Sequence, residues 1–342
     1  MSAKAGRRGR ATIGDVAAHA GVSVATVSNV LNRPELVAAS TLQRVTLAIQ
    51  RVGFVRNEAA RQLRGGSSSL LALLVFDVRN PFWLDIARGV EDVASKAGRM
   101  VILCSTDGSV DKARRYIDLL SQQVVQGMIV PSESPTDDEI ITAEATGAHV
   151  VAIGLQRGDL DMCSVSSDDR LGGDLAMTHL LSRGHRRIWH VTGSLEMVQC
   201  AGRWQGAQDA IARIGGAADI TVLQMAGMTV EQGRRAGEQL LTTQDPPTAV
   251  FCANDLLALG MEQAIIRSGR RIPQDVAIMG YDDIELAAAA GVPITSVHQS
   301  GYTIGRTAGR LLLDEVAAAA VGQPHTHDHR VIQPTLTERL ST

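Results

Sequence analysis

From residue 70 onward, short apolar runs alternate with longer segments in which apolar residues recur at helical spacing. Strands that alternate with helices form parallel sheets through right-handed crossovers. This many units over this length favours two similar α/β lobes over a single sheet. The predicted strands span 70–76, 100–104, 127–130, 149–153, 187–191, 220–224, 249–253 and 276–280, and the predicted helices span 82–97, 111–123, 169–183, 203–214, 230–242 and 255–268.

The preceding stretch, 11–55, has a different pattern of three short amphipathic helices. Thr12 and Asp15 have the spacing of a capping box, Gly21 allows a sharp turn, and Ser23 can cap a second helix running to about residue 31. Ser40 and Gln43 resemble another capping box at the start of a third helix. Two helices joined by such a turn, with a third beside them, predict a helix-turn-helix. The residues expected to face inward are Val16, Ala17, Ala20, Val27, Val30, Leu31, Leu42, Val45, Ile49 and Val52.

The outward face of the second helix is small, polar and uncharged, which suits the major groove of DNA. Asn29 can offer a paired donor and acceptor to a base edge, and Val24 and Ala25 can pack on thymine methyl groups. Hydroxyl, amide and guanidinium groups nearby suit phosphate contacts. The alternative is an ordinary small helical bundle. The candidate DNA contacts here are Thr12, Ser23, Val24, Ala25, Thr26, Ser28, Asn29, Asn32 and Arg33.

The charge distribution supports the DNA interpretation. The 342-residue chain has a net charge of -3, yet residues 1–66 hold ten Lys or Arg against three acids, and the remaining residues hold 23 against 33. A small basic head on a large acidic body indicates a polyanion partner for the head. The first ten residues, MSAKAGRRGR, predict a basic disordered arm.

Composition limits the other possibilities. Hydrophobic residues make up 45% of the chain, no apolar run approaches the length of a membrane helix, and no hydrophobic stretch follows the basic start, so we expect a cytoplasmic, nucleoid-associated protein without a secretory signal. The four cysteines are far apart, which predicts free thiols rather than a zinc site. His325, His327 and His329 alternate in a polar connecting segment, and we expect no metal and no cofactor.

Polar residues follow most of the predicted strands, where open α/β sheets bind ligands. These strand ends read DVRNPFW (77–83), STD (105–107), SES (132–134), SDD (167–169), AND (253–255) and YDD (281–283). Carboxylates and amides beside an aromatic ring predict a site for a sugar or nucleoside. Asp169 and Asp255 begin helices and could equally be caps, and Asn80 before a proline could be a turn. The candidates from these ends are Asn80, Phe82, Trp83, Asp107, Glu133, Asn254, Tyr281 and Asp282.

The head resembles a known family. The stretch from Asp15 to Asn32, DVAAHAGVSVATVSNVLN, is similar to the DNA-binding domain of the lactose-repressor (LacI/GalR) family of bacterial regulators, and RNEAARQLRGG at 56–66 resembles its hinge helix. The resemblance implies that Leu63 enters the minor groove at the centre of a homodimer on a pseudo-palindromic operator, a wedge that would bend the duplex. The hinge contacts it implies are Asn57, Ala59, Ala60 and Leu63.

The body resembles the effector domain of the same family, itself similar to periplasmic sugar-binding proteins. LLSRGHRRI (180–188), RWQGAQDA (203–210), CANDLLALG (252–260) and MGYDDIELA (279–287) carry this resemblance, which implies that Arg203 and Asp282 hold an effector. Gln299 is a further candidate contact. The chain departs from the family at 154–157 and at Glu133. The implied domains are a helix-turn-helix at 11–55, a hinge and linker at 56–69, a first lobe at about 70–163 and 293–330, and a second lobe at about 164–292 and 331–342.

Three alternatives stay open beside a sugar-controlled repressor. A metabolic enzyme is disfavoured because the chain has no G-x-G-x-x-G, G-x-x-x-x-G-K-[ST] or G-x-S-x-G motif, so we expect no catalytic residues. A periplasmic binding protein is disfavoured by the basic head and by the lack of a recognisable signal. A regulator of this family that senses a nucleobase, nucleoside or other metabolite fits the sequence as well.

Overall fold

The structure, a computed structural model, describes residues 11–55, 68–122, 125–132, 138–154 and 161–342. The predicted basic arm and nearly all of the predicted hinge and linker lie outside these ranges. The chain divides into two compact units, Met1–Ser68 and Ser69–Thr342. In the described residues, no helix is long and apolar enough to cross a membrane.

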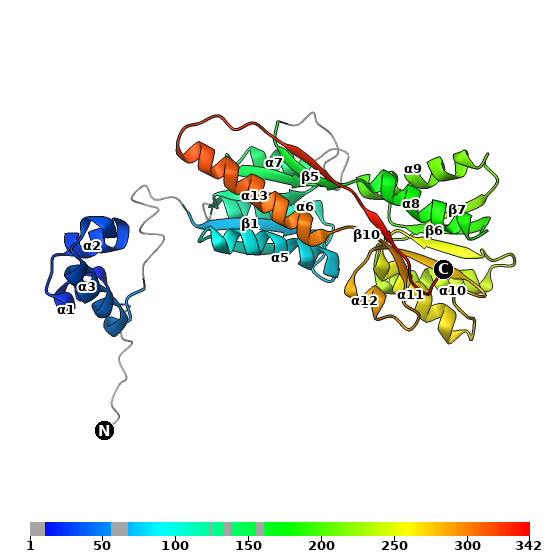
Figure 1. Cartoon of the computed structure of the whole chain (residues 1–342), viewed down its shortest axis with the longest axis horizontal. Helices are drawn as coiled ribbons and strands as arrows, with labels where there is room; N and C mark the ends of the chain where they lie inside the picture. Colours follow the sequence, from blue (N-terminus) through cyan, green and yellow to red (C-terminus); the bar gives the residue numbers. More distant parts are fainter. Residues whose placement is uncertain (1–10, 56–67, 123–124, 133–137, 155–160) are drawn as a thin grey trace, which may run out of the picture. The chain divides into compact units, whose positions relative to one another are not determined.

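In its described residues, 11–55 and Ser68, the first unit has three α-helices around a small apolar core (Figure 1). Its helices are α1 (Ile13–Ala20), α2 (Val24–Asn32) and α3 (Ala39–Val52), with a short 3-10 turn, η1 (Pro34–Leu36), between the last two. Val16, Val27 and Val45 are fully buried at the centre. Thr12 and Asp15 form the capping box predicted for α1, Gly21 ends that helix with a φ of 61°, and the Ser23 side chain caps α2. The predicted helix-turn-helix is therefore confirmed.

The start of α3 differs from the prediction. Ala38 is the N-cap residue and makes no side-chain capping bond, so the capping box expected from Ser40 and Gln43 is wrong. Because α3 begins at Ala39, Ser40 already lies inside the first turn. The inward face of α3 contains the predicted residues: Val45 is buried together with Ala48, and Leu42, Ile49 and Val52 pack against this core.

The second unit begins with a lobe built on a six-stranded parallel sheet. Helices α5 (Pro81–Lys96) and α13 (Gly301–Ala320) cover one face, and α6 (Val110–Gln122) and α7 (Asp138–Glu144) cover the other. Alternate residues of β1 face opposite helix layers, and all are apolar because both faces of the sheet are buried. The strand order is β11 (His329–Ile332), β5 (Cys163–Ser167), β4 (His149–Ile153), β3 (Gly127–Pro131), β1 (Leu70–Val75) and β2 (Met100–Ser105).

A second lobe repeats this architecture, as the sequence predicted. Helices α8 (Asp169–Ser182) and α9 (Val198–Arg213) cover one face of its sheet, while α10 (Val230–Thr242), α11 (Asp255–Arg267) and α12 (Glu285–Ala288) cover the other. All strands are parallel except the last, which pairs antiparallel with β10. The order is β12 (Thr335–Thr337), β10 (Thr295–His298), β9 (Ala277–Asp282), β8 (Ala249–Cys252), β6 (Arg187–Thr192) and β7 (Asp219–Gln224).

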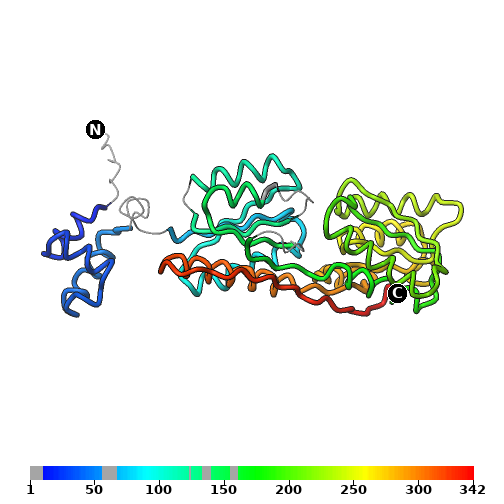
Figure 2. The backbone as a smooth tube through the Cα atoms, turned by 90° about the horizontal axis from the view of Figure 1, so that it is seen from above, coloured from blue at the N-terminus to red at the C-terminus, as the bar shows by residue number. Residues whose placement is uncertain are grey.

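The chain passes between the lobes three times, after β5, after β10 and after β11 (Figure 2). The first passage therefore follows Ser167 rather than residue 163, because β5 pairs with β4 in the first sheet. The second follows His298 rather than residue 292, because β10 pairs with β9. The third follows Ile332, two residues beyond the boundary that the sequence suggested. The segments that follow β5 and β10 supply residues to the cleft described below.

Helices α8 and α9 pack so closely that glycines are required between them. A Cβ atom on Gly206 would lie 1.8 Å from the carbonyl oxygen of Arg170, and one on Gly173 would lie 1.9 Å from that of Arg203. Neither backbone atom can move without shifting its helix. The two glycines thus set the depth at which α9 holds Arg203 against α8.

Candidate functional site

A cleft lies where the carboxyl ends of the strands of both lobes meet. It contains about 600 Å³ of empty space, a figure that includes open solvent. Its aromatic wall is Phe82 and Trp83, whose rings meet edge to face. The lining residues described are Asn80, Phe82, Trp83, Ser132, Ile153, Gly154, Ser167, Asp169, Gln199, Arg203, Met228, Asn254, Asp282, Gln299 and Ile304.

Arg203 is the one cation among the described lining residues, and it is held on three sides. Its Nε donates to Asp169 Oδ1 at 2.9 Å, and its Nη1 donates to the carbonyl oxygen of Ala253. The guanidinium lies over the ring of Tyr281, and the Tyr281 hydroxyl donates to the same Asp169 oxygen at 3.3 Å. Burial alone would lower the pKa of Arg203, but the carboxylate of Asp169 raises it above its ordinary value. Arg203 therefore stays charged.

Asp169, which the sequence allowed as a helix cap, does not cap α8. The N-cap of α8 is Asp168, whose side chain accepts from the backbone N–H of Leu171 at 2.9 Å. Asp169 follows it, points into the cleft and is 5% exposed. Burial raises the pKa of its carboxyl group, and Arg203 opposes that rise. Asp169 is therefore a buried partner of Arg203.

Asp282 connects the two lobes. Its Oδ1 accepts from Gln299 Nε2 at 2.6 Å, and its Oδ2 accepts from Asn80 Nδ2 of the first lobe at 3.5 Å. Burial raises the pKa of Asp282 to about 6, and the Arg203 charge limits the rise. The backbone here has a φ of 100°, a conformation that costs a side-chain-bearing residue on the order of 1–3 kcal/mol and that clusters at functional sites.

The neighbouring asparagines and Asp255 have local structural partners as well. Asn80 caps α5 through the N–H of Phe82, and Asn254 caps α11 through that of Leu257 while its Nδ2 donates to the Met228 carbonyl. Both amides still line the cleft. Asp255 does not, because its carboxylate is fully buried and accepts from the Ile284 N–H and the Ser296 hydroxyl.

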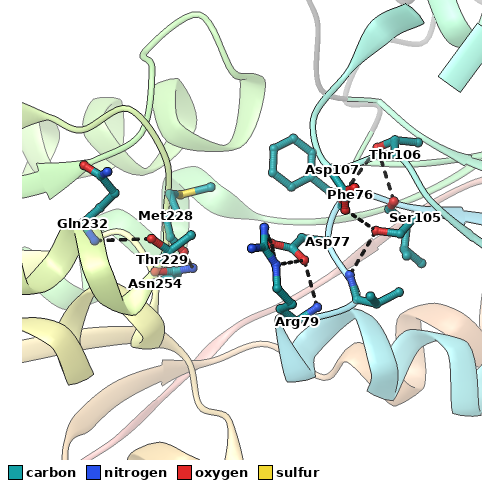
Figure 3. Close-up of polar contacts among 12 residues, drawn as sticks. Phe76, Asp77, Arg79, Ser105, Thr106, Asp107, Met228, Thr229, Gln232 and Asn254 are labelled. Carbon is teal, nitrogen blue, oxygen red and sulfur yellow. Dashed lines mark hydrogen bonds and ion pairs between the residues drawn. The ribbon is translucent and has the colours of Figure 1, made fainter. Parts of the chain in front are cut away.

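Two predicted contacts lie outside the cleft. Asp107 is exposed and binds Lys112 Nζ at 2.6 Å and the Ser105 hydroxyl at 2.8 Å. Figure 3 shows it grouped with Ser105 and Thr106, apart from Asn254 and Met228. The reason is that β2 is the edge strand of its sheet. Tyr281 is fully buried and reaches the site only through Arg203 and Asp169.

Several lining residues were not predicted as contacts. Ser132 and Ser167 belong to the strand ends SES (132–134) and SDD (167–169), which the sequence had indicated as ligand-binding positions. Their location could therefore have identified them as contacts. Gln199 was missed because α9 begins at Val198, five residues before the predicted start. Met228 and Ile304 carry no chemical signal in the sequence. Glu133, a further predicted contact, lies outside the described residues.

In the first unit, the predicted recognition face is exposed as expected. Val24 is 48% exposed, and Ala25 and Asn29 are exposed beside it. Ser23 and Thr26 are partly engaged, since the Ser23 hydroxyl accepts from the Thr26 N–H and bonds its hydroxyl at 2.9 Å.

Two other predicted DNA contacts also have intrahelical roles. The Asn32 amide donates to the Ser28 carbonyl at 2.9 Å, and Thr12 is occupied by its capping box. These side chains thus fix helix geometry. Arg33 is exposed at the C-terminal end of α2. The predicted hinge contacts lie outside the described residues: Asn57, Ala59, Ala60 and Leu63.

Comparisons with known proteins match both units. Residues 12–57 match the model of bacterial regulatory proteins of the lacI family, and residues 177–342 match a periplasmic binding protein-like domain. The chain is 32% identical over 336 residues to the HTH-type transcriptional repressor PurR of Aliivibrio salmonicida (strain LFI1238), covering 97% of this chain and 98% of that protein. It is 33% identical over 312 residues to the HTH-type transcriptional repressor CytR of Escherichia coli (strain K12), covering 91% and 92%.

Solved structures agree with these relatives. A lac repressor dimer bound to operator and the anti-inducer ONPF matches with a TM-score of 0.84 and 26% identity, covering 97% of this chain and 99% of that one. A complex of the transcriptional regulator CelR with cellobiose matches with a TM-score of 0.71 and 31% identity, covering 97% and 100%. The chain therefore belongs to the LacI/GalR family of DNA-binding transcriptional repressors, which act as dimers on operator DNA under the control of a small-molecule effector.

Proposed function

We propose that the effector is a neutral, polyhydroxylated small molecule, a sugar or sugar derivative, held in the cleft between the two lobes. The carrying observation is the charge arrangement of the cleft. Among the described lining residues, the charged ones are Arg203, Asp169 and Asp282, and the cation is already paired with Asp169. An anionic ligand would meet an excess of negative charge there, whereas hydroxyl groups can donate to the carboxylates.

The remaining lining groups fit the same ligand. Gln199, Asn254 and Gln299 offer amides, and the rings of Phe82 and Trp83 offer apolar surface for a sugar ring. The structural relative solved with cellobiose supports this class of ligand. A nucleoside is the alternative, because its ribose has the same hydroxyl chemistry and its base could stack on the aromatic wall. We propose that the ligand is bound without being converted.

Binding is coupled to DNA through the lobes. Asp282 and Asn80 face each other across the cleft, so a ligand that bonds to either one changes the contact between lobes. A ligand shifts such an equilibrium only by its difference in affinity for the two arrangements.

At the DNA, we propose that Asn29 reads a base edge and Arg33 binds phosphate. The proposed interface also includes the hinge residues Asn57, Ala59, Ala60 and Leu63, on the family resemblance. A protein with operator DNA as its partner acts at the bacterial chromosome, in the cytoplasm.

The test is a thermal-shift screen of the full chain against neutral sugars, sugar phosphates, nucleosides and nucleobases, followed by calorimetry. Binding to the folded state raises the unfolding midpoint. We expect a neutral sugar to raise the midpoint of the wild type and of Asp107→Asn, which changes a carboxylate outside the cleft, but not that of Asp282→Asn. A sugar phosphate as the strongest ligand, or an unchanged response in Asp282→Asn, would overturn the proposal.

A further inference from the structure

Four side chains with metal-binding atoms converge in the first lobe, away from the cleft. Cys163 begins β5, Glu315 lies in the second half of α13, and His325 and His327 lie in the connection between α13 and β11. One atom from each of the four residues lies within 4.8 Å of every other. Cys163 is far from the other three residues in sequence, so the spacing of His325 and His327 alone could not reveal the set, and the sequence predicted no metal.

The distances match those between ligands of one metal ion. Cys163 Sγ lies 3.2 Å from His325 Nε2 and 3.7 Å from His327 Nδ1. A tetrahedral zinc ion, with Zn–S of about 2.3 Å and Zn–N of about 2.0 Å, holds sulfur and nitrogen ligands about 3.5 Å apart. The rings of His325 and His327 stand edge to face at 5.3 Å, so both can point a nitrogen at one centre. Glu315 would close the set with a small movement.

Hydrogen bonding alone does not satisfy this cluster. Cys163 Sγ faces two imidazole nitrogens and also accepts from the Asp328 N–H at 3.5 Å, while its single proton can go to only one of the imidazoles. Glu315 Oε1 bonds His149 Nδ1 at 3.0 Å, but its buried Oε2 has no hydrogen-bond partner in the described part of the chain. A buried carboxylate oxygen without a partner is costly, and a metal ion would satisfy it.

The surroundings also fit a metal site. His149 on Glu315 and Asp161, whose Oδ1 lies 3.8 Å from His327 Nε2, are placed to orient ligands from outside, as carboxylate and imidazole partners commonly do. Cys163 is buried and the other three ligands are half-buried, which limits competition from water. His329, in contrast, bonds the Ser164 hydroxyl at 2.9 Å and is not among the four.

We propose that Cys163, Glu315, His325 and His327 bind one divalent transition-metal ion, with Zn²⁺ as the natural occupant. A thiolate and two imidazoles select a borderline metal over Mg²⁺ or Ca²⁺, and four protein ligands leave no open position for chemistry. The ion ties the connection at 321–328 to β5 and α13. All four ligands belong to the first lobe and none lines the cleft. The metal therefore stabilises this lobe and leaves effector and operator affinity nearly unchanged.

The test uses the full chain without a polyhistidine tag, stripped with a chelator and titrated with Zn²⁺ by calorimetry. Co²⁺ is added in parallel, because a thiolate ligand gives a sulfur-to-cobalt charge-transfer band. The variants are Cys163→Ser and His327→Gln, and His329→Gln is the matched control, since it changes a nearby imidazole that points elsewhere.

We expect one Zn²⁺ per chain and a raised unfolding midpoint in the wild type and in His329→Gln. Loss of an outer partner typically lowers metal affinity about 10–100-fold, so loss of a ligand in Cys163→Ser or His327→Gln should cost at least that much. The cobalt band should disappear in Cys163→Ser. If Cys163→Ser does not fold, the Zn²⁺ affinity of His327→Gln tests the proposal. Absence of Zn²⁺ binding in the wild type, or equal affinity in His327→Gln and His329→Gln, would overturn the proposal.

Discussion

The guanidinium of Arg203 lies over the ring of Tyr281, with 3.7 Å between its Cζ and the ring centroid. Both side chains are buried, and both bond the same oxygen of Asp169. A guanidinium stacked on an aromatic face and paired with a carboxylate has little freedom to turn. The cleft thus presents a pre-oriented cation, and Tyr281 holds this cation in place without lining the cleft.

Removing parts of Tyr281 should separate its two roles. Tyr281→Phe keeps the ring and removes the hydroxyl bond to Asp169, so we expect a loss of about 1 kcal/mol in the free energy of unfolding. Tyr281→Leu also removes the stacking and should cost clearly more, with weaker effector binding. Denaturant unfolding and calorimetry measure both. Equal losses in the two variants would show that the stacking contributes nothing.

The pKa of Asp282 predicts an unusual dependence of stability on pH. Burial raises this pKa to about 6 from an ordinary 3.8, so between those values the folded state keeps a proton that the unfolded state has released. Stability therefore falls as pH rises through that window, and the cost is complete above about pH 6. Asp282→Asn removes this ionisation.

We expect Asp282→Asn to be more stable than the wild type at neutral pH, by on the order of 3 kcal/mol, and to approach it near pH 4. The same variant should bind effector more weakly, because it loses a charged acceptor. Urea unfolding across this pH range measures the first effect and calorimetry the second. A stability difference that does not change with pH would contradict the assignment of the titration to Asp282.

Gly206 provides a test of how the packing of α9 against α8 positions Arg203. In Gly206→Ala the new methyl group would lie 1.8 Å from the Arg170 carbonyl oxygen, so α9 must move away from α8. Overpacking of this kind typically costs about 1–3 kcal/mol, and the shift should also weaken effector binding because Arg203 lies on the same helix. Gly227→Ala is the control, since no atom lies within 4 Å of its added Cβ. Equal stability in both variants would count against this account.

The sequence predicted the architecture because the spacing of apolar residues shows which side of each strand or helix is buried. It missed β5, whose residues CSVSS include three serines, although all five are buried. It also missed α13, whose glycines allow it to pack against α5. A Cβ on Gly305 would lie 2.0 Å from the Ile86 carbonyl oxygen, a tertiary contact that no local pattern reveals.

Site residues could be predicted at the ends of strands that lie inside a sheet, but not at the end of an edge strand. Asn254 follows β8 and Asp282 ends β9, both strands lie inside the sheet, and both residues line the cleft. Asp107 also follows a strand, but β2 lies at the edge, and strand order cannot be read from a single sequence. Asp169 was ambiguous for a local reason, since two adjacent aspartates compete for one cap and only the fold shows that Asp168 takes it.

The last prediction divides recognition in the head between two neighbouring residues. Asn29 is exposed on α2, and its side chain makes no hydrogen bond within the described residues, so its amide is available to a base edge. Asn29→Ala should change which operator bases matter, each lost pairing costing about 1–3 kcal/mol. Arg33, also exposed at the end of α2, should act through phosphate, so Arg33→Ala should weaken all sequences alike and reduce the salt dependence. Binding titrations against single-base operator variants at several salt concentrations measure both, and the same uniform loss in the two variants would refute the division.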